Sequence, residues 1–148
     1  PCVRLMEKWA VRIGGGNKHR FALYDMIMIK DNHVDYAGGI ENAIQRTNSY
    51  LTKKGKDLRI EIETRSIEEV KQVLAVGDVD RIMLDNFSIT QLKKAVDMID
   101  SAFETEASGG ISRDTIAGYA ECGVDYISVG ALTHQVKSLD MSLTALSK

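Results

Sequence analysis

The sequence predicts an α/β fold built on a parallel, barrel-like sheet. Short apolar stretches with the composition of β-strands recur at roughly 22-residue intervals, and segments with helical spacing separate them. Strands that alternate with helices form right-handed βαβ units, and their regular spacing favours a barrel over an open wound sheet. A complete barrel of eight units takes roughly 250 residues. The 148 residues therefore predict an open or incomplete portion of a TIM-type barrel.

Five segments have the character of strands, and in each one successive side chains alternate between two faces. We expect the faces made of leucine and β-branched residues to meet the outer helices. The opposite faces, which carry the charged residues, should then point into the barrel. The expected strands are residues 25–30, 58–63, 81–85, 103–107 and 125–130.

Capping signals place helices between these strands. Two serines, each followed three residues later by Glu or Gln, fit the capping box that starts a helix. A third serine precedes another segment with helical spacing, and a glycine follows that segment as its stop. The expected helices begin after Ser66, Ser88 and Ser112, and two more cover residues 1–13, which read as a helix already under way, and residues 37–51.

Composition excludes several classes of protein. Hydrophobic residues make up 44% and charged residues 27%, the balance of a globular domain with a core. The net charge of −2 argues against a nucleic-acid-binding surface, and no apolar run approaches a membrane span. There is no secretory signal pattern, and Cys2 and Cys122 have no CxxC spacing. We therefore expect reduced thiols, a cytoplasmic location, no structural zinc, and no nucleic-acid or membrane partner.

Three expected strands end their inward face in a charged residue, namely Lys30, Glu63 or Asp85. The carboxyl ends of parallel strands are where barrel enzymes place their chemistry. A lysine near two carboxylates can neutralise them, bind anionic groups, or share a divalent cation with substrate oxygens. A structural alternative stays open, in which the ion pairs Lys30–Glu63 and Arg81–Asp85 use up these charges and leave no pocket.

Two glycine turns follow the last two expected strands, in residues 106–112 (EASGGIS) and 128–134 (SVGALTH). Glycine lets the backbone turn tightly and offer its N–H groups to an anion. The helix expected after Gly110 adds a favourable dipole, and His134 can add a donor. Because barrels often bind phosphate between the last two strand-end loops, we expect the glycines of both turns to contact one anion.

Five motifs, in order along nearly the whole chain, resemble the quinolinate phosphoribosyltransferase family. They are GGGNKHR…LYDMIMIKDNH, IEIET, IMLDNF, EASGGI and GVDYISVGALTH. What they resemble is the family's C-terminal barrel portion. The resemblance implies that residues 1–148 are a partial α/β-barrel catalytic domain, with the N-terminal sandwich domain and the first part of the barrel missing. It also implies that the fragment alone can be inactive.

The resemblance implies a reaction that belongs to NAD biosynthesis. Quinolinate and phosphoribosyl pyrophosphate, with Mg²⁺, give nicotinate mononucleotide, pyrophosphate and carbon dioxide. The expected partners are therefore these two small-molecule substrates. Members of the family assemble at least as dimers with the site shared between subunits, so we expect a homodimer or a higher homo-oligomer.

Site residues are carried over where this sequence matches the family's motifs. His19, Arg20 and Lys30 match the cradle for the quinolinate dianion, and an arginine can hold a carboxylate through two parallel hydrogen bonds. Glu63 and Asp85 match acidic residues that face the ribose hydroxyls and the magnesium-bound pyrophosphate, where fixed negative charge stabilises a developing oxocarbenium ion. The expected catalytic residues are thus Lys30, Glu63 and Asp85, with Mg²⁺ near the two acids, largely through substrate oxygens. The matching phosphate-binding positions are Ser108, Gly109, Gly110, Gly130 and His134.

The sequence departs from the family pattern at Cys2, where glycine is common, and at Lys18, where asparagine is common. The second change bears on the geometry of the quinolinate cradle. A threonine-arginine-lysine-threonine segment of the family, whose cations contact quinolinate and the phosphates, and an arginine of its N-terminal domain are absent from this sequence.

Three rival interpretations stay open. A barrel isomerase or aldolase of a phosphosugar explains the glycine turns, although it does not require the HR and IKDNH motifs. A transport-associated relative of the same family would keep the fold with changed or lost activity. A structural remnant would keep the charged residues only as ion pairs.

Overall fold

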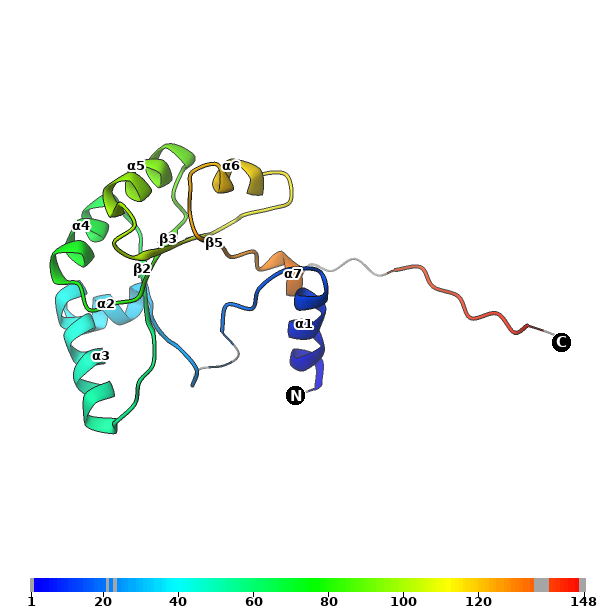
Figure 1. Cartoon of the computed structure of the whole chain (residues 1–148), viewed down its shortest axis with the longest axis horizontal. Helices are drawn as coiled ribbons and strands as arrows, with labels where there is room; N and C mark the ends of the chain where they lie inside the picture. The colour runs from blue at the N-terminus through cyan, green and yellow to red at the C-terminus, as the bar shows by residue number, and fades with distance from the viewer. Residues whose placement is uncertain (1, 21, 23, 135–138, 147–148) are drawn as a thin grey trace.

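The computed structural model describes residues 2–20, 22, 24–134 and 139–146, which contain a five-stranded sheet in the order β1-β2-β3-β4-β5. Every pairing is parallel. Each strand lies next to its successor in the chain, as in a (β/α) barrel, and β1 and β5 form the edges of an open portion (Figure 1). The predicted fold class is confirmed. The strands are β1 (Ile27–Ile29), β2 (Ile60–Thr64), β3 (Arg81–Asp85), β4 (Glu104–Ser108) and β5 (Tyr126–Ile127).

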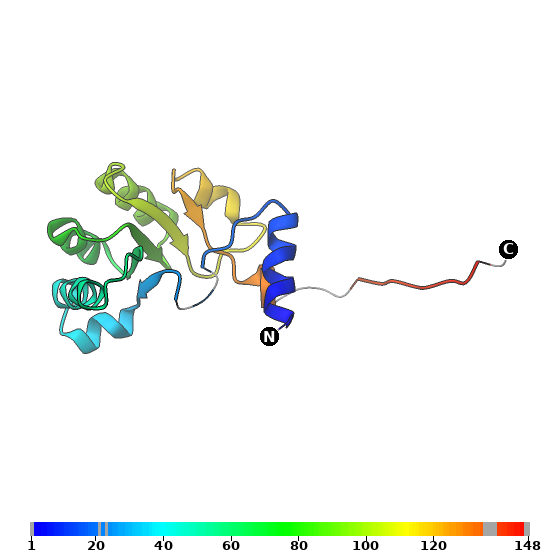
Figure 2. The same ribbon diagram turned by 60° about the horizontal axis from the view of Figure 1, so that its bottom comes forward.

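Most helices cover the outer face of this sheet, and one stands apart from them. In both views α1 lies beside α7, near β5 and on the opposite side of the molecule from α3 (Figures 1 and 2). No helix among the described residues is long and apolar enough to cross a membrane. The helices are α1 (Cys2–Ile13), α2 (Asp31–Ala37), α3 (Ile40–Lys54), α4 (Ile67–Val76), α5 (Ile89–Ile99), α6 (Ile116–Ala120) and α7 (Ala131–His134).

The hydrophobic core lies between the outer helices and the apolar face of the strands. Ile62, Ile82 and Leu84 are fully buried in one cluster with Val70 of α4 and Leu92 of α5. The register sets Ile62 beside Ile82 across β2 and β3, so the apolar face is continuous, as the alternation predicts. Each such side chain stabilises the fold by about 1.5–3 kcal/mol relative to leaving it exposed.

Two of the predicted capping serines start helices. Ser88 forms a full capping box, since its Oγ accepts from Gln91 N and the Gln91 amide oxygen accepts from Ser88 N. Ser66 Oγ accepts from Glu69 N at 3.2 Å, but the Glu69 carboxylate accepts from Arg65 N instead of closing the box. The cap at Ser66 is therefore one-sided.

The helix expected over residues 37–51 is present as α3, but it begins at Ile40, and a separate helix, α2, comes before it. Gly38 and Gly39 have φ values of +83° and +126°, which end α2 and turn the chain before α3 begins at Ile40. Such angles favour glycine and break a helix. The prediction missed α2 because this short helix directly follows β1, with only Lys30 between them.

Candidate active site

The parallel strands bring their carboxyl ends to one edge of the sheet, and several predicted site residues follow from this. Lys30 comes directly after β1, where it is the exposed N-cap residue of α2. Glu63 lies near the end of β2, and Asp85 and Ser108 are the last residues of β3 and β4. The register places Asp85 opposite Ser108. The predicted strand-end residues therefore share one edge.

Glu63 and Asp85 lie on neighbouring strands, but not at the same level. Glu63 is opposite Met83, so Asp85 lies two residues further toward the carboxyl edge. Burial raises the pKa of Glu63, and the negative charges of Asp85 and Asp31 raise this pKa further. The positive charges of Lys30 and Arg65 oppose that rise. Two carboxylates and a lysine thus act on one another here, as the sequence predicts.

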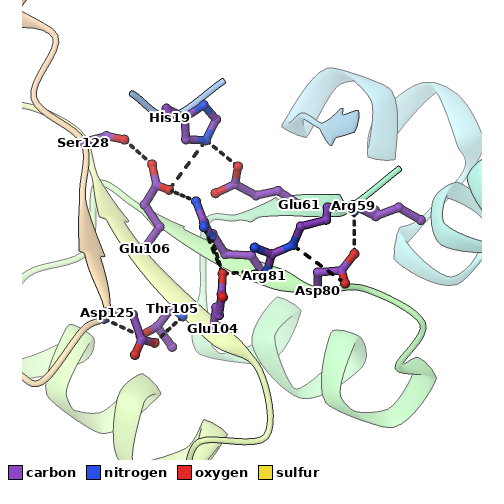
Figure 3. Close-up of polar contacts among 11 residues, drawn as sticks. His19, Arg59, Glu61, Asp80, Arg81, Glu104, Thr105, Glu106, Asp125 and Ser128 are labelled. Carbon is purple, nitrogen blue, oxygen red and sulfur yellow. Dashed lines mark hydrogen bonds and ion pairs between the residues drawn. The ribbon is translucent and has the colours of Figure 1, made fainter. Parts of the chain in front are cut away.

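Below this edge, the inward face of the sheet carries a buried network of charged groups (Figure 3). His19 Nε2 lies 2.5 Å from Glu61 Oε2 and 3.5 Å from Glu106 Oε2. Glu61 and Glu106 are almost fully buried, whereas the His19 side chain is 22% exposed. Burial raises the pKa of Glu106, and the charge of Glu61 raises it further. The Ser128 hydroxyl donates to Glu106.

Arg81 is the main cation of this network. Its guanidinium donates to Glu106 Oε2 at 2.8 Å and to Glu104 Oε2 at 2.9 Å. It also stacks over the Tyr126 ring, with Cζ 3.9 Å from the ring centroid, a favourable cation–π distance. The ion pairs of the structural alternative, Lys30–Glu63 and Arg81–Asp85, do not form among the described side chains. Arg81 instead forms ion pairs with Glu104 and Glu106 of β4.

Arg20 lies next to His19 in the chain but makes a different contact. Its Nη1 donates to the backbone oxygen of Met26 at 3.3 Å, and the residue is half-buried. This contact joins Arg20 to Met26, the residue before β1. One guanidinium nitrogen of Arg20 is therefore engaged by the backbone.

The two glycine turns lie at the same end of the sheet, because β4 and β5 are parallel neighbours. Gly109 and Gly110 have φ values of +97° and +60°. Asn86 N donates to Ser108 O at 2.9 Å, which joins the turn after β4 to the turn after β3. Gly130 follows β5 and precedes α7. The predicted neighbourhood of the two turns is confirmed, while the anion itself stays a prediction.

The helix expected after Ser112 is present as α6, but it begins later than predicted. α6 begins only at Ile116, since Thr115 Oγ1 accepts from Ser112 N at 3.0 Å and the chain first makes a turn. The N-terminus of α6 is therefore separated from Gly110 by residues 111–115. The side chain of His134, the last residue of α7, lies outside the part of the chain that the structure describes.

A cavity of about 450 Å³ opens on the inward face, between the sheet, α1 and the segment that precedes β1. It brings His19 together with Gly130, two predicted site residues from opposite ends of the chain. Lys30, Glu63 and Asp85 are not in its lining. Its polar lining includes Lys8, Asn17, Lys18, His19, Arg81, Glu106, Tyr126, Ser128 and Thr133.

The sequence-based site prediction missed Glu61, Arg81, Glu106 and Ser128. A signal for them existed, because strand alternation already places Glu61 and Arg81 on the inward face. Barrel interiors are usually filled by bulky apolar side chains, so several buried charged residues on one inward face mark a special site.

A parallel sheet of successive β/α units, with charged residues and paired glycine turns at its carboxyl edge, defines a portion of a (β/α) barrel protein. Comparison with known families makes this specific, since the family model "Quinolinate phosphoribosyl transferase, C-terminal domain" matches residues 1–144. The chain belongs to this family. The resemblance inferred from the motifs is thereby confirmed.

Relatives and solved structures agree with this assignment. The chain is 48% identical to the chloroplastic nicotinate-nucleotide pyrophosphorylase [carboxylating] of Arabidopsis thaliana, over 97% of this chain and 45% of that protein. It is 42% identical to the probable nicotinate-nucleotide pyrophosphorylase [carboxylating] of Bacillus subtilis, over 97% and 48%. The crystal structure of NadC from Streptococcus pyogenes superposes with a TM-score of 0.89 at 41% identity, over 98% and 50%. The chain therefore spans about half the length of the curated relatives it matches.

Proposed function

We propose that this chain is the catalytic barrel portion of a carboxylating nicotinate-nucleotide pyrophosphorylase. The reaction transfers the phosphoribosyl group of phosphoribosyl pyrophosphate to quinolinate, with loss of carbon dioxide. The observation that carries the proposal is the common edge of the sheet, where Lys30, Glu63 and Asp85 lie on successive strand ends and both glycine turns emerge. The names of the relatives supply the activity.

In this proposal the cations receive the quinolinate dianion. His19, Arg20 and Lys30 supply the charged donors for its two carboxylates, and charge-assisted hydrogen bonds of this kind are about twice as strong as neutral ones. The phosphate of the second substrate binds at the two glycine turns, through Ser108, Gly109, Gly110 and Gly130, with His134 as a further donor.

Glu63 and Asp85 act on the sugar. As the bond from the anomeric carbon to pyrophosphate breaks and the bond to the pyridine nitrogen forms, positive charge develops on the ribose. Fixed carboxylates close to that charge stabilise it. The raised pKa of Glu63, caused by burial and by the charge of Asp85, fits a divalent cation at this place, because a nearby cation relieves such repulsion. Mg²⁺ held mainly through substrate oxygens would neutralise charge on the leaving pyrophosphate.

We also propose that the protein assembles as a homodimer or a higher homo-oligomer. Its proposed location is the cytoplasm. α1 leaves large apolar side chains exposed, and a neighbouring domain or subunit would cover them. The buried Cys122 is a free thiol, which suits a reducing compartment. The exposed apolar residues of α1 are Val3, Leu5, Met6, Trp9 and Ile13.

The test uses the full-length protein with quinolinate, phosphoribosyl pyrophosphate and Mg²⁺. We expect nicotinate mononucleotide, pyrophosphate and carbon dioxide in equal amounts. Arg20→Ala should weaken quinolinate binding by about 3–6 kcal/mol if the contact is bidentate, at roughly 1.5–3 kcal/mol per charged hydrogen bond. Arg46→Ala, at an exposed position of α3, is the matched control. Equal losses for both substrates in calorimetry would count against the assignment of Arg20.

A further inference from the structure

Glu61 occupies an unusual position for a carboxylate. It lies in β2 on the inward face of the sheet and is 0% exposed. Its Oε2 contacts His19, whereas its Oε1 has no hydrogen-bond partner among the described residues. A buried carboxylate with so few partners carries a large desolvation cost. Its presence therefore calls for a role that an apolar residue could not fill.

His19, by contrast, lies in a segment with no helix or strand between α1 and β1. Such a backbone does little to restrict the direction of a side chain. The contact of 2.5 Å to Glu61 links the imidazole across 42 residues to β2, an inner strand of the sheet. Pairing with β1 and β3 fixes the position of β2, whereas no helix or strand pairing fixes the backbone at His19, so Glu61 is placed to set the direction of the imidazole.

The second carboxylate near the ring is already engaged. Glu106 Oε2 lies 3.5 Å from His19 Nε2 but accepts from Arg81 at 2.8 Å, and Ser128 donates to the same carboxylate. His19 and Glu61 together with Glu106 could also ligate a divalent metal, since their ligand atoms lie within 4.8 Å of one another. The Arg81 guanidinium beside Glu106 places a permanent positive charge where such an ion would sit, which disfavours this alternative.

We propose that Glu61 is a positioning residue, which accepts a hydrogen bond from His19 Nε2–H so that the Nδ1–H of the imidazolium ring is presented to a carboxylate of the substrate. This rests on the proposed function, in which His19 contacts quinolinate. In Figure 3 the second ring nitrogen points away from both carboxylates, and His19 lines the cavity on the inward face. A carboxylate that fixes the orientation and tautomer of a functional histidine is a recurrent device in metal and acyl-transfer sites.

The first experiment is Glu61→Gln in the full-length protein, which keeps the shape and removes the charge. We expect quinolinate affinity in calorimetry to fall about tenfold or more, as for other residues that orient a functional histidine, with phosphoribosyl pyrophosphate affinity unchanged. Because Glu61 acts through His19, the double variant Glu61→Gln/His19→Ala should bind quinolinate no worse than His19→Ala. Glu104→Gln is the matched control, since Glu104 contacts Arg59 and Arg81 without contacting His19.

Equal losses for both substrates, or additive effects with His19→Ala, would overturn the positioning role. So would stoichiometric Zn²⁺ binding to the wild-type protein that Glu61→Gln abolishes, since the cluster would then be a metal site. If Glu61→Gln does not fold, the side-chain ¹⁵N signals of His19 in the wild-type protein decide. Protons on both ring nitrogens support the inference, and a neutral ring with a proton on only one nitrogen contradicts it. This measurement needs no substrate, so failure of the wild type to bind quinolinate would count against the proposed function only.

Discussion

Gly109 lies directly against Asn86, and no side chain fits between them. A Cβ placed on Gly109 would lie 2.3 Å from Asn86 Oδ1 and 2.7 Å from Asn86 N. Both residues have positive φ, +97° and +57°. The turns that follow β3 and β4 are therefore packed backbone to backbone, which sets the glycine turn at a fixed place beside Asp85.

This contact predicts that Gly109→Ala is strongly destabilising. The substitution adds a positive-φ penalty of about 1–2 kcal/mol and a clash with backbone that cannot move freely, so we expect a loss of at least about 2 kcal/mol in the free energy of unfolding. Gly110→Ala is the control in the same turn, since its φ is +60° and no atom lies within 4 Å of its Cβ. It should cost about 1 kcal/mol. Urea unfolding that gives the same value for both variants would show that the close approach is unimportant.

Arg81→Met tests the buried ion-pair network. The side chain of Arg81 is 8% exposed, and its loss leaves Glu106 buried without its cation, which typically costs about 3–5 kcal/mol. The control is Arg65→Met, whose residue makes ion pairs with Asp35 and Glu69 at an exposed site. Exposed pairs contribute about 0–1 kcal/mol. Chemical denaturation should therefore separate the two variants clearly, and similar losses would contradict the burial argument.

The pH dependence of stability should report on Glu104. Burial acts to raise its pKa, but hydrogen bonds from Arg59 and Arg81 outweigh that effect and lower the pKa below its ordinary 4.5. A lowered folded pKa means that the charged form stabilises the fold above pH 4.5, and that this contribution is lost as pH falls through the folded value. Glu104→Gln should thus reduce stability at pH 7, and the difference from wild type should vanish in acid. A constant difference from pH 7 to pH 3 in urea unfolding would rule out this electrostatic origin.

The sequence predicts the sheet well because apolar and charged residues alternate along each strand, and this pattern can be recognised within the strand alone. β3 has the predicted bounds, and Ile82 faces the helices while Arg81 faces inward, as expected. Which groups pair across strands could not be predicted. Arg81 could reach acids on either side, and its choice of Glu106 over Asp85 follows from a register and side-chain geometry that form only in the fold.

The same distinction applies to the candidate site. Lys30, Glu63 and Asp85 are predictable because strand ends of a parallel sheet must meet. The contact between His19 and Glu61 is not, because His19 lies in a segment without regular structure and no periodicity constrains its direction. The start of α6 could not be predicted either. Serine often caps a helix, but here Ser112 N donates to Thr115 Oγ1 and the chain makes a turn before α6 begins.

Asp85→Asn in the full-length protein tests the role of the strand-end acids. Asp85 is half-buried at the end of β3 and accepts a hydrogen bond from Asn86 Nδ2 at 2.6 Å. Asparagine keeps the shape of the side chain and removes its charge. If the carboxylate stabilises positive charge on the ribose, the lost interaction exists mainly in the transition state, so kcat should fall while the KM for each substrate changes little.

We expect a loss of about a hundredfold in kcat, the scale seen when one electrostatic contact to a developing charge is removed. Steady-state kinetics at saturating Mg²⁺ measure it, and thermal unfolding establishes that the variant is folded. Asp97→Asn, at an exposed position of α5, should leave kcat unchanged. A folded Asp85→Asn protein with wild-type turnover would make Asp85 a structural residue of the β3 turn. Glu63, on the neighbouring strand, would then be the only one of the two acids left to stabilise the charge on the sugar.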